Sequence, residues 1–101
     1  MTVQVLSADP EVKQGPDKLL SSRHLVVTRL VIPKGEAIQR HRSLMTVTVV
    51  SIKGQVEFHT DDDVTTLVPG KAVVMQPGEF HWLEAPAEDG EVMVVHGVLA
   101  Q

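Results

Sequence analysis

Two histidines in similar local sequences are the side chains of this chain best suited to chemistry. His41 lies in G-E-A-I-Q-R-H-R-S at 35–43, and His81 ends G-K-A-V-V-M-Q-P-G-E-F-H at 70–81. Imidazole binds transition metals and exchanges protons near neutral pH. Metal sites of the zinc type, however, take three or four protein ligands. The two stretches therefore predict either an incomplete metal site or two polar contacts for a bound molecule.

Two of the three other histidines could add a third ligand. His24 shares the alternation of the apolar residues that follow it, which turns its side chain toward the interior. His96 has apolar residues on both faces of its segment, so its direction stays open. His59 alternates with Glu57 and is expected to face solvent. For each of the three, a hydrogen-bonded structural histidine is the plainer interpretation.

The elements that must position these histidines are strands. Valine-rich or alternating runs end at turn signals such as Pro-Lys-Gly at 33–35, Lys-Gly at 53–54 and Pro-Gly at 69–70 and 77–78. Segment 11–22 has little periodicity and is expected to form a loop or arm. The runs predict an all-β antiparallel barrel or jelly roll of roughly eight or more strands. The expected strands are 3–6, 24–32, 45–52, 55–60, 64–68, 72–76, 80–85 and 91–99.

Length and charge narrow the function classes. The 101 residues make a single domain, with an N-terminal strand and arm at 1–22 and a barrel at 23–99. A net charge of −4 argues against nucleic acid and anionic membranes as partners. No apolar run approaches the ~20 residues of a membrane span. The N-terminus lacks a secretion-signal pattern and cysteine is absent, so a cytoplasmic protein is expected.

The two histidine stretches resemble the paired motifs of the cupin superfamily, a β-barrel or jelly-roll fold. Gly35, His41 and Gly54 match the frame of the first motif, and the stretch from Gly70 to His81 matches the second. The resemblance covers roughly residues 24–99. Family members with the full motifs bind a divalent metal through three histidines and a carboxylate. The resemblance thus implies a double-stranded β-helix with a central cavity.

Three motif positions depart from the family pattern. Ser43 stands where the family has its second histidine, Val47 where it has the metal-binding glutamate, and Ala85 where it has the closing asparagine. The resemblance leaves His41 and His81 as metal ligands, with His24 or His96 as a possible third. It also implies a ligand pocket, whose expected residues are His41, Ser43, Val47, Phe58, Met75, His81 and Leu83.

Two functions remain open, and whether the protein is an enzyme is not decided. In one, the barrel cavity binds a small, partly apolar molecule, requires no cofactor, and binds metal weakly or not at all. In the other, a divalent transition metal on His41 and His81 serves a dioxygenase, isomerase or decarboxylase that acts on a small organic acid. We also expect a homodimer, because cupins of this size commonly form dimers. The apolar segment 3–6, the arm and Trp82 could contact a second copy of the chain.

Overall fold

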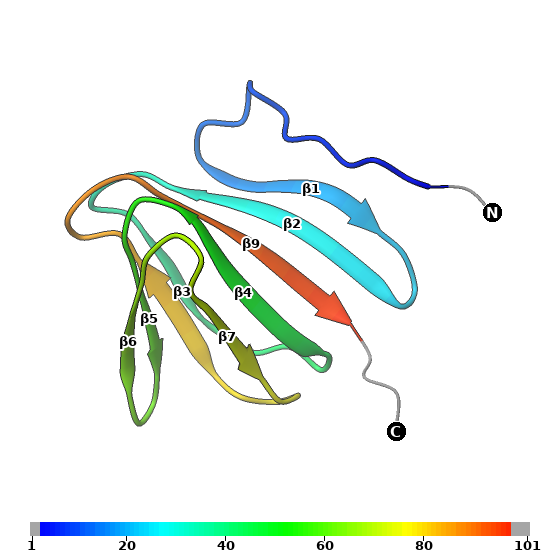
Figure 1. Ribbon diagram of the computed structural model, residues 1–101. Coiled ribbons are helices and arrows are strands. Elements are labelled where there is room, and N and C mark those ends of the chain that lie inside the picture. Colours follow the sequence, from blue (N-terminus) through cyan, green and yellow to red (C-terminus); the bar gives the residue numbers. More distant parts are fainter. Residues whose placement is uncertain (1–2, 98–101) are drawn as a thin grey trace.

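The computed structural model describes residues 3–97, which form nine β-strands and no helix (Figure 1). All strand pairs are antiparallel, which confirms the predicted all-β class. Within these residues no helix is long and apolar enough to cross a membrane. The strands are β1 (Gly15–Ser21), β2 (Leu25–Ile32), β3 (Ala37–His41), β4 (Thr46–Lys53), β5 (Val56–Thr60), β6 (Val64–Leu67), β7 (Ala72–Met75), β8 (His81–Glu84) and β9 (Gly90–Gly97).

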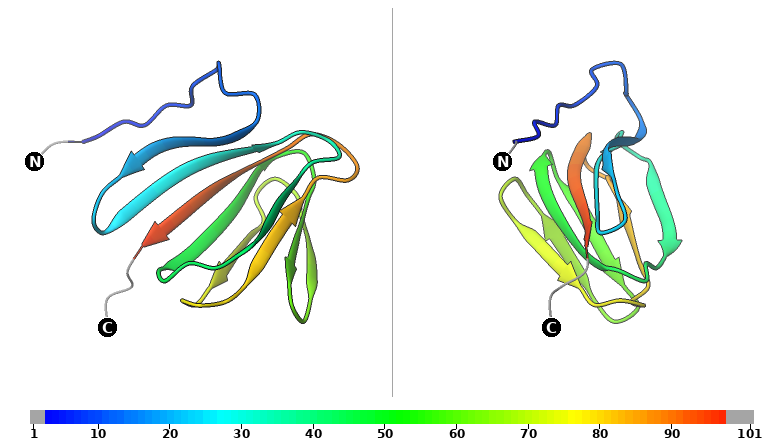
Figure 2. Two further views of the ribbon diagram at one scale, coloured as in Figure 1. Left: turned by 180° about the vertical axis from the view of Figure 1, so that it is seen from behind. Right: turned by 90° about the vertical axis from the view of Figure 1, so that its right-hand side faces the viewer.

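The strands make two sheets that enclose the core. The larger sheet has the order β1-β2-β9-β4-β7, and the smaller has the order β3-β8-β5-β6. Both orders bring together strands that are distant in sequence, as β9 does when it pairs with β2 and β4. The N-terminal segment runs back beside β1, outside both sheets (Figure 2).

The core comes from the inward-facing residues of both sheets. In β4, for example, Val47, Val49 and Ser51 are buried, while the residues between them are more exposed, as a pleated strand with one covered face requires. The buried apolar residues are Ile32, Val47, Val49, Val56, Phe58, Leu67, Met75, Leu83, Ala85 and Val92.

Two glycines allow close packing at one end of the barrel. A β-carbon added to Gly54, in the turn after β4, would lie 2.0 Å from the carbonyl oxygen of Asp89. One added to Gly90, at the start of β9, would lie 2.4 Å from Cγ2 of Val56. Both distances are far below van der Waals contact. At Gly54 the obstructing atom belongs to the backbone, so glycine is required there. Gly54 also has a φ of 67°, which favours glycine.

The N-terminal region differs from its prediction. Within segment 11–22, expected as a loop or arm, residues 15–21 form strand β1, whereas the expected strand at 3–6 does not form. Residues 15–21 form a strand because they pair with β2, although their own sequence has no strand-like alternation. The predicted end of the last strand at 98–99 lies outside the described residues.

A buried guanidinium fastens this region to the outer face of the larger sheet. Arg29 of β2 donates from Nε to Asp17 at 3.0 Å and from Nη1 to Glu91, and its Nη2 donates to the carbonyl oxygens of Asp9 and Val12 at 2.9 and 3.3 Å. The hydrogen bond to Glu91 is the main reason that the pKa of Arg29 is raised. The backbone N–H of Asp9 is the main reason that the pKa of Asp17 is lowered. Arg29 therefore stays charged and ties the N-terminal segment to β2 and β9.

Candidate functional site

The two motif histidines lie next to each other at the end of the barrel opposite Gly54. His41 ends β3 and His81 begins β8, and the two are paired across these neighbouring strands. Their ring centroids are 4.1 Å apart in an edge-to-face arrangement. Forty residues of chain separate them, so the strand pairing of the smaller sheet brings them together.

Backbone carbonyls orient both rings. Nδ1 of His41 lies 2.7 Å from the carbonyl oxygen of Gln39, and Nδ1 of His81 lies 3.1 Å from that of Glu79. A carbonyl can only accept, so Nδ1 carries the proton in both rings. In the neutral tautomer Nε2 then has a free lone pair, which can bind a metal or accept a hydrogen bond.

Burial keeps the deeper histidines neutral. His81 is 3% exposed and stacks on Phe58 with centroids 5.8 Å apart. Desolvation is the main reason that its pKa lies below the ordinary 6.5. His96 on β9 has a lowered pKa, first through desolvation and then through the charge of His41. Nδ1 of His96 is buried without a hydrogen-bond partner. His81 and His96 are therefore neutral imidazoles at neutral pH.

The histidines line a cavity of about 170 Å³ between the sheets. His96 belongs to it, which resolves the direction that the sequence left open. His24 lies exposed in the bend between β1 and β2 and is not among the lining residues. The lining residues are Thr28, Leu30, Ile38, His41, Val49, His81, Leu83, Val94 and His96.

The remaining expected pocket residues lie elsewhere. Val47, Phe58 and Met75 pack in the core and do not line this cavity. Ser43 follows β3, where its Oγ accepts from the N–H of Met45 at 3.1 Å and its carbonyl accepts from the N–H of Gly78. Ser43 thus fixes the loop. Sequence reasoning missed the cavity residues of β2 and of the middle of β9, although the same alternation that it applied to His24 marks Thr28 and Leu30 as inward-facing.

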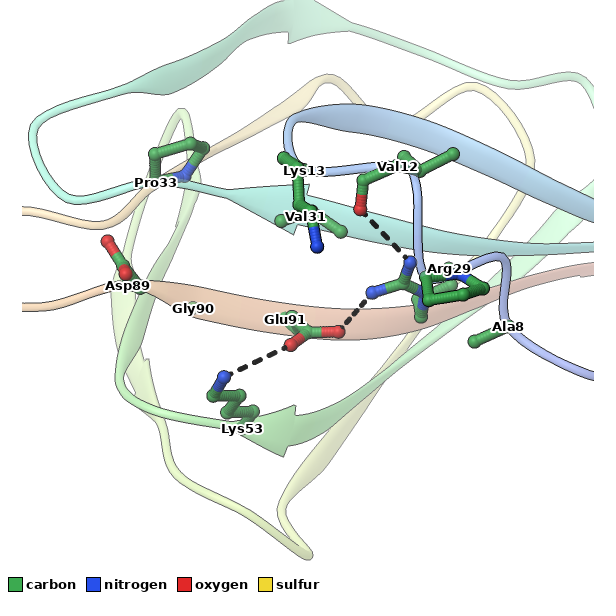
Figure 3. A pocket seen from close by; sticks show the side chains of 11 residues that line it. Ala8, Val12, Lys13, Arg29, Val31, Pro33, Lys53, Asp89, Gly90 and Glu91 are labelled. Carbon is green, nitrogen blue, oxygen red and sulfur yellow. Dashed lines mark hydrogen bonds and ion pairs between the residues drawn. The ribbon is translucent and has the colours of Figure 1, made fainter.

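A larger hollow of about 470 Å³ lies away from the histidines, under the N-terminal segment (Figure 3). Lys13, Lys53 and Asp89 line it together with Arg29 and Glu91. Each nitrogen of the Arg29 guanidinium already has a partner within the protein, and Lys53 lies 3.7 Å from Glu91. Arg29 holds the N-terminal segment through the carbonyl oxygens of Asp9 and Val12, so we assign the hollow a structural role despite its size.

The cavity histidines fit a transition metal in donor type but not in arrangement. Three neutral imidazoles are a known zinc set, and two of them have a free Nε2. Their ligand atoms, however, do not all lie within 4.8 Å of one another. Val47, at the position of the missing carboxylate, is buried and provides no donor. The cavity as it stands is not a closed metal site.

Comparisons with known proteins agree with the fold. An RmlC-like cupin family protein with a double-stranded β-helix fold from Methanocaldococcus jannaschii aligns over 97% of this chain and 93% of its own, with a TM-score of 0.84 and 22% identity. An uncharacterized conserved protein with a double-stranded β-helix domain from Klebsiella pneumoniae aligns over 95% and 90%, with a TM-score of 0.79 and 22% identity.

A conserved protein of unknown function from Streptococcus pyogenes shares 26% identity over 85% of this chain and 75% of its own, with a TM-score of 0.76. No curated protein matches the sequence. The family model for the cupin domain matches residues 28–97, more than half of the chain. With its two antiparallel sheets and this match, the chain belongs to the cupin domain family.

Proposed function

We propose that this protein binds a small, partly apolar molecule in the histidine-lined cavity without needing a metal. The observation that carries the proposal is the composition of the cavity wall. Side chains such as Leu30, Val49 and Leu83 make most of it apolar, while neutral histidines gather at one end. Pockets that bind small molecules combine an apolar wall with a few polar groups that orient the ligand.

The cavity volume limits the ligand. A closed cavity of about 150 Å³ holds one benzene molecule in another protein, and this cavity measures about 170 Å³. The part of a ligand that fills the cavity should therefore be about the size of a single six-membered ring or a short branched chain.

The histidines define the polar group. The free Nε2 of His41 and His81 accepts hydrogen bonds, so a hydroxyl or another donor is preferred over an apolar group of similar size. An acceptor left without a partner at such a site, as Nε2 would be with benzene, costs about 1–3 kcal/mol. We therefore expect phenol to bind roughly tenfold or more tightly than benzene.

A metal-dependent enzyme that acts on a small organic acid is the second candidate. The free Nε2 atoms of His41 and His81 favour it. Because His96 lines the cavity and His24 does not, His96 is the better candidate for a third nitrogen, which would have to move closer to the other two. A bound metal would supply a Lewis acid at the mouth of the cavity.

We also propose a cytoplasmic location, as expected from the sequence. The chain has no cysteine and so forms no disulfide, which is usual for cytosolic proteins.

The test is ligand binding to tag-free protein after dialysis against a chelator. Phenol, benzene and cyclohexanol are titrated while the histidine ring signals are followed by NMR, with His24→Gln as the control because His24 is exposed and outside the cavity. We expect phenol to shift the signals of His81 and His96 in both proteins. Equal affinity for phenol and benzene, or no binding, contradicts the proposal. Stoichiometric metal in protein analysed before dialysis favours the enzyme.

A further inference from the structure

The outer face of the smaller sheet holds a second cluster of ligating side chains, separate from the cavity. In β5, Val56 and Phe58 point into the core, so Glu57 and His59 lie on the opposite face. In β8, Leu83 points inward in the same way, and Glu84 lies outward. Glu57 and Glu84 are directly opposite each other across the two strands. Like charges in such a pair repel, so this arrangement calls for a cation.

His59 completes the cluster. Its Nε2 lies 2.7 Å from Oε1 of Glu84 and 3.6 Å from Oε2 of Glu57. The side chain is 14% exposed. Nε2 itself is buried and has no hydrogen-bond partner, although Glu84 lies within ion-pair distance. The ring stacks on Trp82, its cross-strand neighbour, at 5.1 Å and 10°, so both its direction and its burial are fixed.

We propose that Glu57, His59 and Glu84 form a site for a divalent transition metal of the zinc class. In the described part of the chain they are the one group of three such residues whose ligand atoms all lie within 4.8 Å of one another. Zinc bonds of 2.0–2.2 Å place tetrahedral ligand atoms about 3.3 Å apart. The two measured distances from Nε2 lie on either side of that value, so small side-chain rotations complete the site.

The donor set identifies the class of ion. One imidazole and two carboxylates suit Zn²⁺, Co²⁺ or Mn²⁺, whereas Mg²⁺ and Ca²⁺ prefer oxygen ligands alone. The charge of a divalent ion balances both carboxylates. Three protein ligands leave a tetrahedral ion one position for water or an exogenous group. The ion would also join β5 to β8 through side chains, in addition to the strand pairing.

The site can be tested through the only tryptophan of the chain, Trp82, which stacks on the proposed ligand. Tag-free protein is titrated with Co²⁺, which quenches nearby tryptophan fluorescence, and Zn²⁺ is then added as a competitor. We expect saturable quenching that Zn²⁺ reverses. Because each glutamate supplies a ligand, Glu57→Gln and Glu84→Gln should each weaken Co²⁺ binding by roughly tenfold or more.

Two controls separate this site from other metal-binding groups. Glu88→Gln removes an exposed carboxylate in the loop between β8 and β9, and His41→Gln removes an exposed imidazole of the cavity. Both variants should bind Co²⁺ as the parent does. Circular dichroism verifies that every variant is folded. Absence of saturable quenching means that the cluster is only an ion pair and overturns the proposal. Quenching that survives both glutamate substitutions, or that is lost in His41→Gln, also overturns it.

Discussion

The stability of this protein should fall on mild acidification because of its buried histidines. The pKa of His81 and that of His96 lie below 6.5 in the folded protein, mainly through desolvation. In the unfolded chain each imidazole regains its ordinary pKa near 6.5. Below that value the unfolded state binds more protons than the folded state. The stabilising contribution is therefore complete above about pH 6.5 and is lost as the pH falls toward the folded pKa.

The size of the effect follows from proton linkage. Each histidine that is protonated only in the unfolded state lowers the free energy of unfolding by at most about 1.4 kcal/mol per pH unit. His81, which is 3% exposed and stacked on Phe58, is the stronger contributor. Asp17 does not interfere, because its pKa is lowered from 3.8 and its contribution is lost only in stronger acid.

The assay is urea unfolding, followed by circular dichroism at several values between about pH 7 and about pH 5, with linear extrapolation to water. We expect the free energy of unfolding to decrease across this range in the parent protein. His81→Gln should reduce the pH dependence, because glutamine does not titrate. His24→Gln, which removes an exposed imidazole, is the matched control. A free energy of unfolding that is constant or rises on acidification refutes the reasoning, as does an unchanged slope in His81→Gln.

Three further predictions concern the cavity, the lost metal ligands and the assembly. Leu83 is buried and lines the cavity, so Leu83→Ala should lower the free energy of unfolding by about 2–5 kcal/mol. It should also shift ligand preference toward larger rings. A loss of stability well below this range in urea unfolding would show that the cavity wall collapses into the space left by the leucine. Val47→Glu combined with Ser43→His should tighten Ni²⁺ or Zn²⁺ binding sharply in calorimetry, since the pair restores the family's ligands; equal affinities in parent and variant would contradict the motif alignment. We also propose a homodimer that uses the N-terminal segment, where Val3 and Val5 are 87% and 82% exposed. Sedimentation should then give a species of twice 11.0 kDa, which deletion of residues 1–10 weakens, whereas an 11.0 kDa species at micromolar concentration rejects it.

The sequence predicts most strands of the barrel because the signals that mark a strand, alternating side chains and turn residues, are local. Valine alternation and Pro-Gly turns mark β2, β4 and β9 and the turn before His81. It does not predict β1, because that strand has no apolar alternation of its own. Pairing with β2, together with contacts from Asp17 to Arg29 and the N–H of Asp9, holds it in place. These contacts link segments whose relationship is not visible in a local pattern.

The candidate sites also combine features that local sequence patterns predict with features that depend on other strands. His41 and His81 can be paired from their motif positions alone. His96 cannot, because both faces of β9 carry apolar residues; the neighbouring strands β2 and β4 decide which face is covered. For His59, alternation gives the outward face correctly. The burial of its Nε2 depends on Trp82 and Glu84, which another strand contributes, so the sequence pattern alone predicts a solvated side chain.

The close main-chain packing at Gly54 has a consequence for how a ligand would exchange. At Gly54 the obstruction is main chain against main chain, so no side-chain rotation opens a passage there. The exposed His41 lies at the opposite end and lines the cavity. We therefore expect a ligand to enter and leave by one route, past the imidazoles that line the cavity. Substitutions at His41 should consequently change association and dissociation rates together, and amide hydrogen exchange should be slower around Gly90 than around His41.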